Sequence, residues 1–247
     1  MKKMWSRGII KANAKTALRG RYWTAFLVSL LAMILMRGLS GAEQWKTYTG
    51  YIFHPGYAMR VADSGAGGFS LFVILFGIFI GAPILIGKAR FYVHNRFGST
   101  DAGVLFSGFS RDYLNGVGAV FVTYLFVGLW YILLIVPGIV KTVQYSMVQY
   151  ILSDNSAMPG SRARQISRML TDGEKGAIFV FWLSFLGWYI LGAICLGVGI
   201  LFVNPYFDAS MAELYVFLRD RAIQSGRLNP AELGLQPVAP APGPEVY

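Results

Sequence analysis

The chain has 247 residues, of which 55% are apolar and only 14% are charged. Such a composition, with long stretches free of charge, excludes an ordinary soluble domain and leaves no room for a separate soluble catalytic domain. The formal net charge is +10. Basic residues beside apolar spans usually set membrane topology and meet anionic headgroups, so we expect no nucleic-acid partner. The composition predicts one all-α integral membrane domain.

Residues 1–21 form a basic N-terminal segment whose charges recur every four residues. The residues in this pattern are Arg7, Lys11, Lys15 and Arg19. Steps of four place them on one face of a helix, which predicts an amphipathic surface helix that contacts anionic lipid on the inner leaflet. A charged leader that only fixes orientation is the alternative. A cleaved signal peptide is disfavoured because Arg37 directly follows the apolar run.

Apolar stretches follow at 22–36, 69–87, 117–140 and 177–203, and each is long enough to suggest a membrane helix. Two of them have ambiguous continuations. Residues 134–155 are broken at Pro137-Gly138 and then carry polar side chains, and residues 204–218 contain two carboxylates. Hydropathy alone does not decide whether these continuations cross the membrane again.

The distribution of Lys and Arg favours two returning helices, because basic residues in short loops face the cytoplasm. The predicted bundle then has about six transmembrane helices, at about 22–39, 69–87, 117–136, 139–153, 177–194 and 196–218. Both termini are cytoplasmic, and 18 of the 22 Lys and Arg residues fall in four cytoplasmic segments. These segments are 1–21, 88–116, 154–176 and 219–247.

Three connecting regions complete the predicted organisation. A second amphipathic surface helix is expected within 158–172, where Ile166, Met169 and Leu170 share one face. The outer loop, 40–68, is rich in aromatic residues, as is typical of a membrane interface. Residues 219–247 form a Pro-rich cytoplasmic tail.

Asp208 and Glu213 are the strongest signal for a site, because an ionised carboxylate in hydrocarbon is costly unless it is paired or hydrated. We expect them to share a polar intramembrane site with Lys141, Gln144 and Gln149 on the returning helix. Such a site suits a proton, a cation or a substrate. In the alternative interpretation the carboxylates are only paired locally, with Glu213 next to Arg219 or Lys175.

No pattern in the sequence predicts catalysis, a metal or a cofactor. His54 and His94 are predicted on opposite sides of the membrane, Ser184 has no evident His or Asp partner, and Cys195 is the single cysteine. The aromatic residues of 177–194, among them Trp182 and Trp188, could line a substrate cage, although packing against helices and lipid is their commoner role.

Residues 128–218 carry the most distinctive segments: GLWYILLIVPGIVKTVQYSMVQYILSDN, SRMLTDGEKGAIFVFWLSFLGW and LGVGILFVNPYFDASMAELYVFL. With WSRGIIKANAKTALRGRYW and LFSGFSRDYL, they resemble a bacterial family of multi-pass membrane proteins known as a domain of unknown function, number nine-seven-five. The likeness covers most of residues 4–218. There is also a distant similarity to the membrane region that accompanies some glycerophosphodiester phosphodiesterases, which lacks their catalytic part. The resemblance implies a membrane protein and assigns no functional residue.

These patterns together predict a multi-pass protein of the bacterial cytoplasmic membrane that is not an enzyme. Its expected role is transport-associated, or the handling of a substrate or lipid. A membrane-interaction or lipid-organising module is the alternative, and a membrane-embedded lipid enzyme is less favoured. The expected partners are anionic membrane lipids and either another membrane protein or a second copy of the chain.

Overall fold

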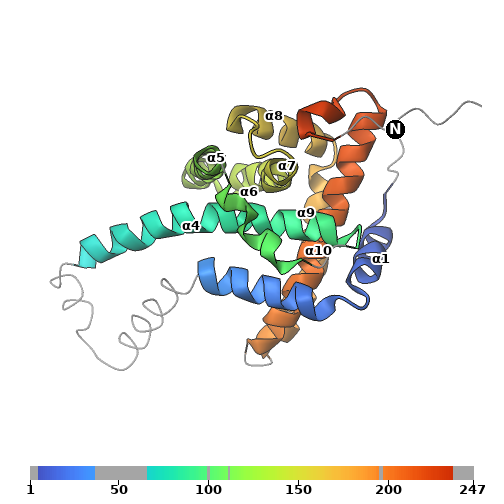
Figure 1. Ribbon diagram of the computed structural model, residues 1–247, viewed down its shortest axis with the longest axis horizontal. Coiled ribbons are helices and arrows are strands. Elements are labelled where there is room, and N and C mark those ends of the chain that lie inside the picture. Colours follow the sequence, from blue (N-terminus) through green and yellow to red (C-terminus); the bar gives the residue numbers. More distant parts are fainter. Residues whose placement is uncertain (1–4, 37–65, 99–100, 111, 195–196, 236–247) are drawn as a thin grey trace, which may run out of the picture.

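The computed structural model describes residues 5–36, 66–98, 101–110, 112–194 and 197–235, and every regular element in this part is helical (Figure 1). The first helices are α1 (Arg7–Leu18), the helix Tyr22–Met36 and α4 (Ala66–Asn95). The 3₁₀ helix η1 (Ala102–Phe109), α5 (Tyr113–Leu133), α6 (Ile135–Tyr145), α7 (Val148–Asp154) and α8 (Gly160–Thr171) follow. The chain continues through α9 (Lys175–Ile194), α10 (Val198–Gln224) and the short 3₁₀ helix η2 (Pro230–Leu233).

Three helices are long and apolar enough to cross a membrane, which indicates membrane association. They are Phe76–Asn95 within α4, Tyr113–Leu133 and Lys175–Ile194. The pair formed by α1 and Tyr22–Met36 would be a fourth if it is one broken span, but its two helices meet at 99°. The described residues therefore support an all-helical membrane protein. By length and composition they contain three candidate spans, or four with the bent pair, and not the predicted six.

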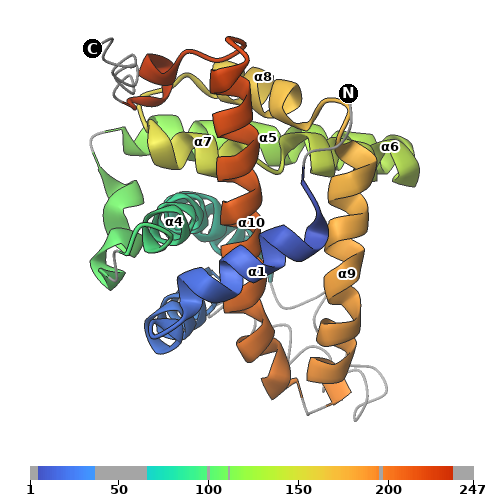
Figure 2. The ribbon, with the colours of Figure 1, turned by 90° about the vertical axis from the view of Figure 1, so that its right-hand side faces the viewer.

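The candidate spans do not lie side by side as in an upright bundle. Figures 1 and 2 show α4, α5 and α9 running in clearly different directions, with α10 passing between them. Helix α10 contacts α1, α4, α8 and α9, and α4 in turn contacts η1, α5 and α7, so these two helices join most of the other elements.

The segment predicted to return as one helix over 139–153 is divided into two short helices. Leu134 is extended, with φ −159° and ψ 140°, and this break separates α5 from α6. Pro137 lies in the first turn of α6, where its missing N–H costs no helical hydrogen bond. A second break at Ser146-Met147 begins α7. Since α6 has 11 residues and α7 has 7, neither alone spans a bilayer.

Helix α10 is one continuous helix of 27 residues and extends beyond the predicted end at residue 218. It contains Pro205 and the charged residues Asp208, Glu213 and Arg219, all of them buried. These charges explain why α10 is not among the apolar candidate spans. The predicted amphipathic helix of 158–172 corresponds to α8, with Ile166 and Leu170 buried.

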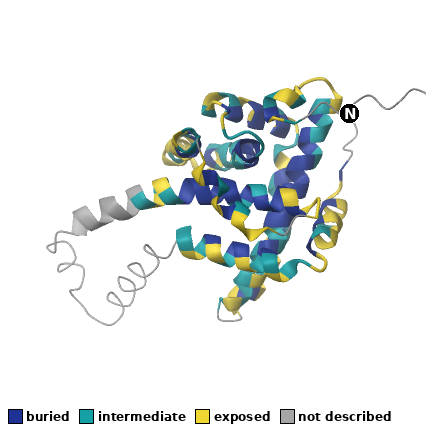
Figure 3. Ribbon diagram, viewed as in Figure 1, coloured by how far each residue is buried: buried dark blue, intermediate teal, exposed yellow. Residues whose placement is uncertain are grey.

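Buried residues gather along the second halves of α4 and α10 and around α7 (Figure 3). Tyr215 of α10 and Ile151 and Leu152 of α7 are completely buried. Close packing matters here because lipid tails are as apolar as side chains, so helices in a membrane associate through contact rather than through escape from water. At Gly87, for example, an added Cβ would overlap the backbone carbonyl of Leu105, so only glycine lets η1 lie against α4.

Most of the predicted outer loop, the end of the Pro-rich tail and residues 1–4 lie outside the described residues.

Candidate functional site

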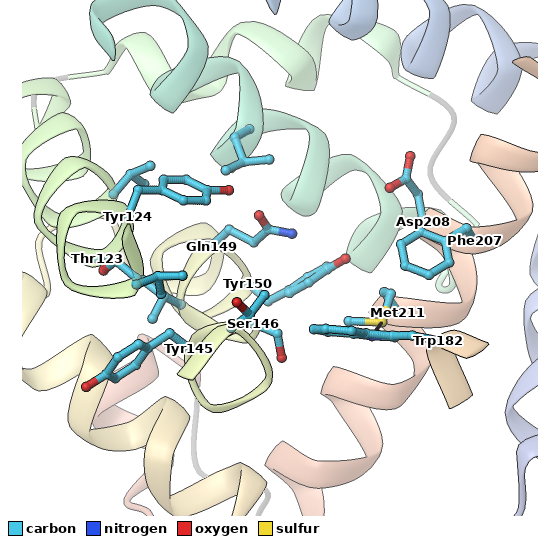
Figure 4. A pocket seen from close by; sticks show the side chains of 15 residues that line it. Thr123, Tyr124, Tyr145, Ser146, Gln149, Tyr150, Trp182, Phe207, Asp208 and Met211 are labelled. Carbon is cyan, nitrogen blue, oxygen red and sulfur yellow. Dashed lines mark hydrogen bonds between the residues drawn. The ribbon is translucent and has the colours of Figure 1, made fainter. Parts of the chain in front are cut away.

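A cavity of about 300 Å³ lies between α5, α6, α7, α9 and α10 (Figure 4), and Leu85 of α4 also lines it. Its wall is mainly apolar and aromatic, with a few hydroxyl and amide groups. The lining residues are Leu85, Val120, Thr123, Tyr124, Val127, Thr142, Tyr145, Ser146, Val148, Gln149, Tyr150, Trp182, Phe207, Asp208 and Met211. Pockets of this size and composition hold small ligands.

Among the lining residues that the structure describes, Asp208 is the one that carries a charge. Lys88 Nζ of α4 lies 2.9 Å from Oδ1 and 3.1 Å from Oδ2 of its carboxylate, and Ser29 Oγ donates to Oδ2 at 3.0 Å. Ser29 Oγ is also 2.6 Å from the hydroxyl of Tyr92, which donates to the Ala25 carbonyl at 2.9 Å. The Asp208 carboxylate thus joins α10, α4 and the helix Tyr22–Met36.

The ion pair explains how a carboxylate is accommodated within an apolar helix. The side chains of Lys88 and Asp208 are 21% and 13% exposed, so both charges are largely withdrawn from solvent. A charge withdrawn in this way is tolerated when an opposite charge and hydrogen bonds satisfy it. The stem of Lys88 reaches from the second half of α4, and Asp208 lies one turn after Pro205 in α10.

Aromatic side chains occupy opposite sides of the cavity. Figure 4 shows Tyr124 and Tyr145 on one side and Trp182, Phe207 and Asp208 on the other, with the hydroxyl of Tyr150 pointing toward Asp208. The indole N–H of Trp182 lies 3.2 Å from the sulfur of Met211, which positions its ring on the wall.

A second polar cluster lies next to the cavity. The ring of Tyr150 stacks on Tyr215 with the centroids 5.4 Å apart, and the Tyr215 hydroxyl donates to Asp154 Oδ2 at 2.6 Å. Arg219 Nη1 lies 3.0 Å from the same oxygen, and its side chain is only 7% exposed. Burial raises the pKa of Asp154, and the Arg219 guanidinium opposes that rise.

The structure brings only part of the predicted polar site together. Asp208 and Gln149 both line the cavity, but Glu213 instead pairs with Arg96, at 3.3 Å. Lys141 Nζ lies 5.0 Å from the centre of the Trp130 ring, outside the cavity wall. Gln144 is buried next to α8, whose Ser167 hydroxyl donates to the Gln144 carbonyl at 2.8 Å. The predicted local partners, Arg219 and Lys175, are therefore replaced by Arg96, the residue that directly follows α4.

The basic residues of α1 recur every four residues, but their environments differ. Lys11 Nζ donates to the Ser184 carbonyl at 3.1 Å and lies 4.1 Å from the centre of the Phe185 ring, so it faces α9. Lys15 Nζ lies 5.8 Å from the centre of the Tyr206 ring. Burial lowers the pKa of Lys11, and the nearby charges of Arg7 and Lys15 lower it further. Arg7, Lys15 and Arg19 are exposed, and their contact with anionic headgroups stays a prediction.

Sequence reasoning missed Lys88, Ser29 and Tyr92, which hold Asp208. One signal was present: Lys88 and Asp208 are opposite charges, each within an apolar helix. Isolated charges of opposite sign in apolar helices tend to pair. Of the aromatic residues weighed for a cage, Trp182 lines the cavity, whereas Trp188 is 55% exposed.

The family described as "Protein of unknown function (DUF975)" matches residues 68–222, which is more than half of the chain. The matched part contains every residue that lines the cavity and also Lys88. No curated protein matches the chain, and no solved structure matches it. The more distant likeness to the membrane region of glycerophosphodiester phosphodiesterases is not shown by these comparisons.

Proposed function

The chain belongs to the DUF975 family of proteins of unknown function, and from this premise we propose that it is a non-enzymatic membrane protein that binds a small substrate or lipid in the cavity beside Asp208. This role is transport-associated or lipid-handling. The observation that carries the proposal is the Asp208–Lys88 ion pair at the wall of an open cavity of about 300 Å³. Ionisable residues within membrane helices commonly mark substrate and ion pathways.

We propose binding rather than turnover because of the chemistry of the cavity wall. The hydroxyls of Thr123 and Ser146 donate to carbonyls of their own helices, those of Ala119 at 2.6 Å and Val143 at 2.8 Å. Within the described lining, no histidine or second carboxylate lies beside them to activate a nucleophile.

We also propose the orientation predicted from charge, with both termini on the cytoplasmic face of a bacterial membrane and α6 with α7 counted as one of six passages. Hydrogen bonds and ion pairs between the four predicted cytoplasmic segments support this placement. Arg21 Nη1 donates to the Asn95 carbonyl at 3.3 Å, Asn115 Nδ2 to the Ser156 carbonyl at 2.8 Å, and Arg162 Nε to Glu232 Oε2 at 2.9 Å. Such direct contacts are expected between segments that lie on the same face of the membrane.

Cysteine accessibility tests the orientation. In a Cys195→Ser background, single cysteines at Gly50, Thr100 and Gln165 should react with a membrane-impermeant maleimide from outside, inside and inside, respectively, because Lys and Arg concentrate around the latter two. Labelling is compared in intact cells and in permeabilised cells. Reaction of the residue-165 cysteine in intact cells would contradict the orientation.

Blocking the cavity tests the proposed function. Val127 lines the cavity from α5, so Val127→Trp should fill it, whereas Leu125→Trp places the same ring on an exposed position of the same helix. Purified protein in dodecyl maltoside is titrated with 2-phenylethylamine, 2-phenylethanol and 3-phenylpropionate by equilibrium dialysis. We expect saturable binding of at least one probe to the parent and to Leu125→Trp, with at least about a tenfold loss in Val127→Trp. Absence of binding by all three probes, or equal binding to both variants, would contradict the proposal.

A further inference from the structure

We propose that the ligand of this cavity is an organic cation, an ammonium group attached to an aromatic or aliphatic body, and that its ammonium takes the place of Lys88 at Asp208. The inference rests on the proposed function and adds the chemical class of the ligand. It is carried by three features: the charge of the wall, its aromatic rings and a neighbouring apolar cleft.

The charge of the wall favours a cation. Asp208 lines the cavity, whereas Lys88, which neutralises it, is not among the lining residues. A ligand therefore meets the carboxylate from the cavity side, while Lys88 approaches from α4. An anionic ligand would place a like charge beside Asp208, and an uncharged one would gain at most a hydrogen bond to it. A ligand ammonium gains an ion pair that is poorly screened because water is largely excluded.

The aromatic rings provide the second contribution. Five of the lining side chains are aromatic, namely Tyr124, Tyr145, Tyr150, Trp182 and Phe207. The faces of such rings attract ammonium groups, and the attraction grows when the cation is desolvated. Figure 4 shows that rings stand on both sides of the space that Asp208 borders, so a cation there would contact rings as well as the carboxylate.

An apolar cleft beside the cavity accounts for the body of the ligand. This cleft has a volume of about 180 Å³ and shares Leu85, Val120 and Tyr124 with the cavity. Its remaining lining residues are Met36, Gly77, Ile78, Gly81, Ala82 and Phe121, none of which carries a charge. The two spaces together offer a charged end and an apolar end, as an amphiphilic amine requires.

The Lys88 ammonium can be displaced from Asp208 by the ammonium of a ligand. Without a ligand it prevents Asp208 from being an uncompensated charge. Its side chain is 21% exposed, more than that of Asp208, and it is a flexible four-carbon stem that can reorient when another cation arrives. The exchange keeps one positive charge at Asp208 throughout, so it avoids the cost of a lone carboxylate.

Matched probes test the inference in purified protein. 2-Phenylethylamine, 2-phenylethanol and 3-phenylpropionate have similar bodies and are cationic, neutral and anionic at pH 7. The parent should bind the amine at least about tenfold more tightly than the alcohol, and the acid most weakly. Lys88→Met should tighten binding of the amine, since it removes the competing cation, and Asp208→Asn should reduce the amine-to-alcohol ratio to about one. The double variant Lys88→Met/Asp208→Asn carries no unpaired charge and should also show no preference, which covers the case in which the single Asp208 variant does not fold.

The outcomes separate the inference from the proposed function. Equal binding of amine and alcohol to the parent, or weaker amine binding in Lys88→Met, would overturn the cation assignment while leaving a binding cavity. Failure of all three probes would instead overturn the proposed function. Two sources of the ammonium are distinguished by repeating the titration in phosphatidylglycerol nanodiscs with and without phosphatidylethanolamine. Weaker amine binding in the presence of phosphatidylethanolamine supports a lipid headgroup as the cation, and unchanged binding supports a soluble amine.

Discussion

Asp208→Asn is expected to lower the free energy of unfolding by about 1.5 to 3 kcal/mol, because it removes the charge-assisted hydrogen bonds between the carboxylate and the Lys88 ammonium, which must then turn toward solvent. The two groups are 2.9 Å apart, and Ser29 supplies the carboxylate with a further hydrogen bond. The substitution preserves side-chain volume, so the lost stability comes from the removed charge and not from altered packing. Urea unfolding in mixed micelles, followed by circular dichroism, measures it.

The double variant Lys88→Met/Asp208→Asn is the matched control for this prediction. Replacing both partners removes the unpaired charge, so most of the lost stability should return. If the single and double variants unfold at the same denaturant concentration, the pair does not contribute as the geometry requires.

Arg219→Met is expected to have a larger effect, about 3 to 5 kcal/mol, at the second polar cluster. Arg219 and Asp154 are 7% and 6% exposed, and their atoms are 3.0 Å apart. Removing the guanidinium leaves the Asp154 carboxylate buried with the Tyr215 hydroxyl as its remaining short hydrogen bond. Arg162→Met is the exposed counterpart: Arg162 pairs with Glu232 at 2.9 Å, but the two side chains are 39% and 35% exposed. Its loss should cost at most about 1 kcal/mol.

The stability of Arg219→Met should also depend on pH in a defined direction. The pKa of Asp154 is already raised by burial, and loss of Arg219 raises it further. A carboxyl group whose pKa is raised by folding favours the folded state when it is protonated and loses that contribution as the pH rises through its folded pKa. The deficit of Arg219→Met relative to the parent should therefore shrink as the pH falls from about 8 to about 5. A deficit that grows as the pH falls would contradict the burial of an unpaired carboxylate.

The sequence was sufficient for the helical class and for the cores of three membrane helices, because long apolar runs have few alternatives in a chain so poor in charge. It misplaced the break after α5. Pro137 and Gly138 drew attention as helix breakers, yet a proline in the first turn is compatible with a helix, and the break lies at Leu134. Hydropathy and charge counts also contain no information on the directions of helices, which Figures 1 and 2 show to differ.

The candidate site was predictable only in part, because sequence identifies an unusual residue but not the neighbours that folding brings to it. Asp208 was identifiable because a carboxylate in an apolar helix needs an explanation, and Gln149 was placed with it. The opposite charge of Lys88 was a signal for the partner of Asp208 but could not assign it, since Lys88 is 120 residues away in the chain and reaches Asp208 only through the packing of α4 on α10. Equally, the spacing of Arg7, Lys11, Lys15 and Arg19 identifies a helix face but not its environment, and Lys11 turns out to contact α9.

The most direct test of the central claim, a ligand-accessible cavity beside Asp208, is chemical protection of a cysteine on its wall. In a Cys195→Ser background, Val127→Cys should react with a small methanethiosulfonate reagent, and saturating 2-phenylethylamine should slow that reaction by at least about tenfold, since the occupied cavity excludes the reagent. Leu125→Cys, on the exposed side of the same helix, should react at the same rate with and without the amine. A cysteine at 127 whose reaction rate is unaffected by the amine, the alcohol and the acid would contradict the claim.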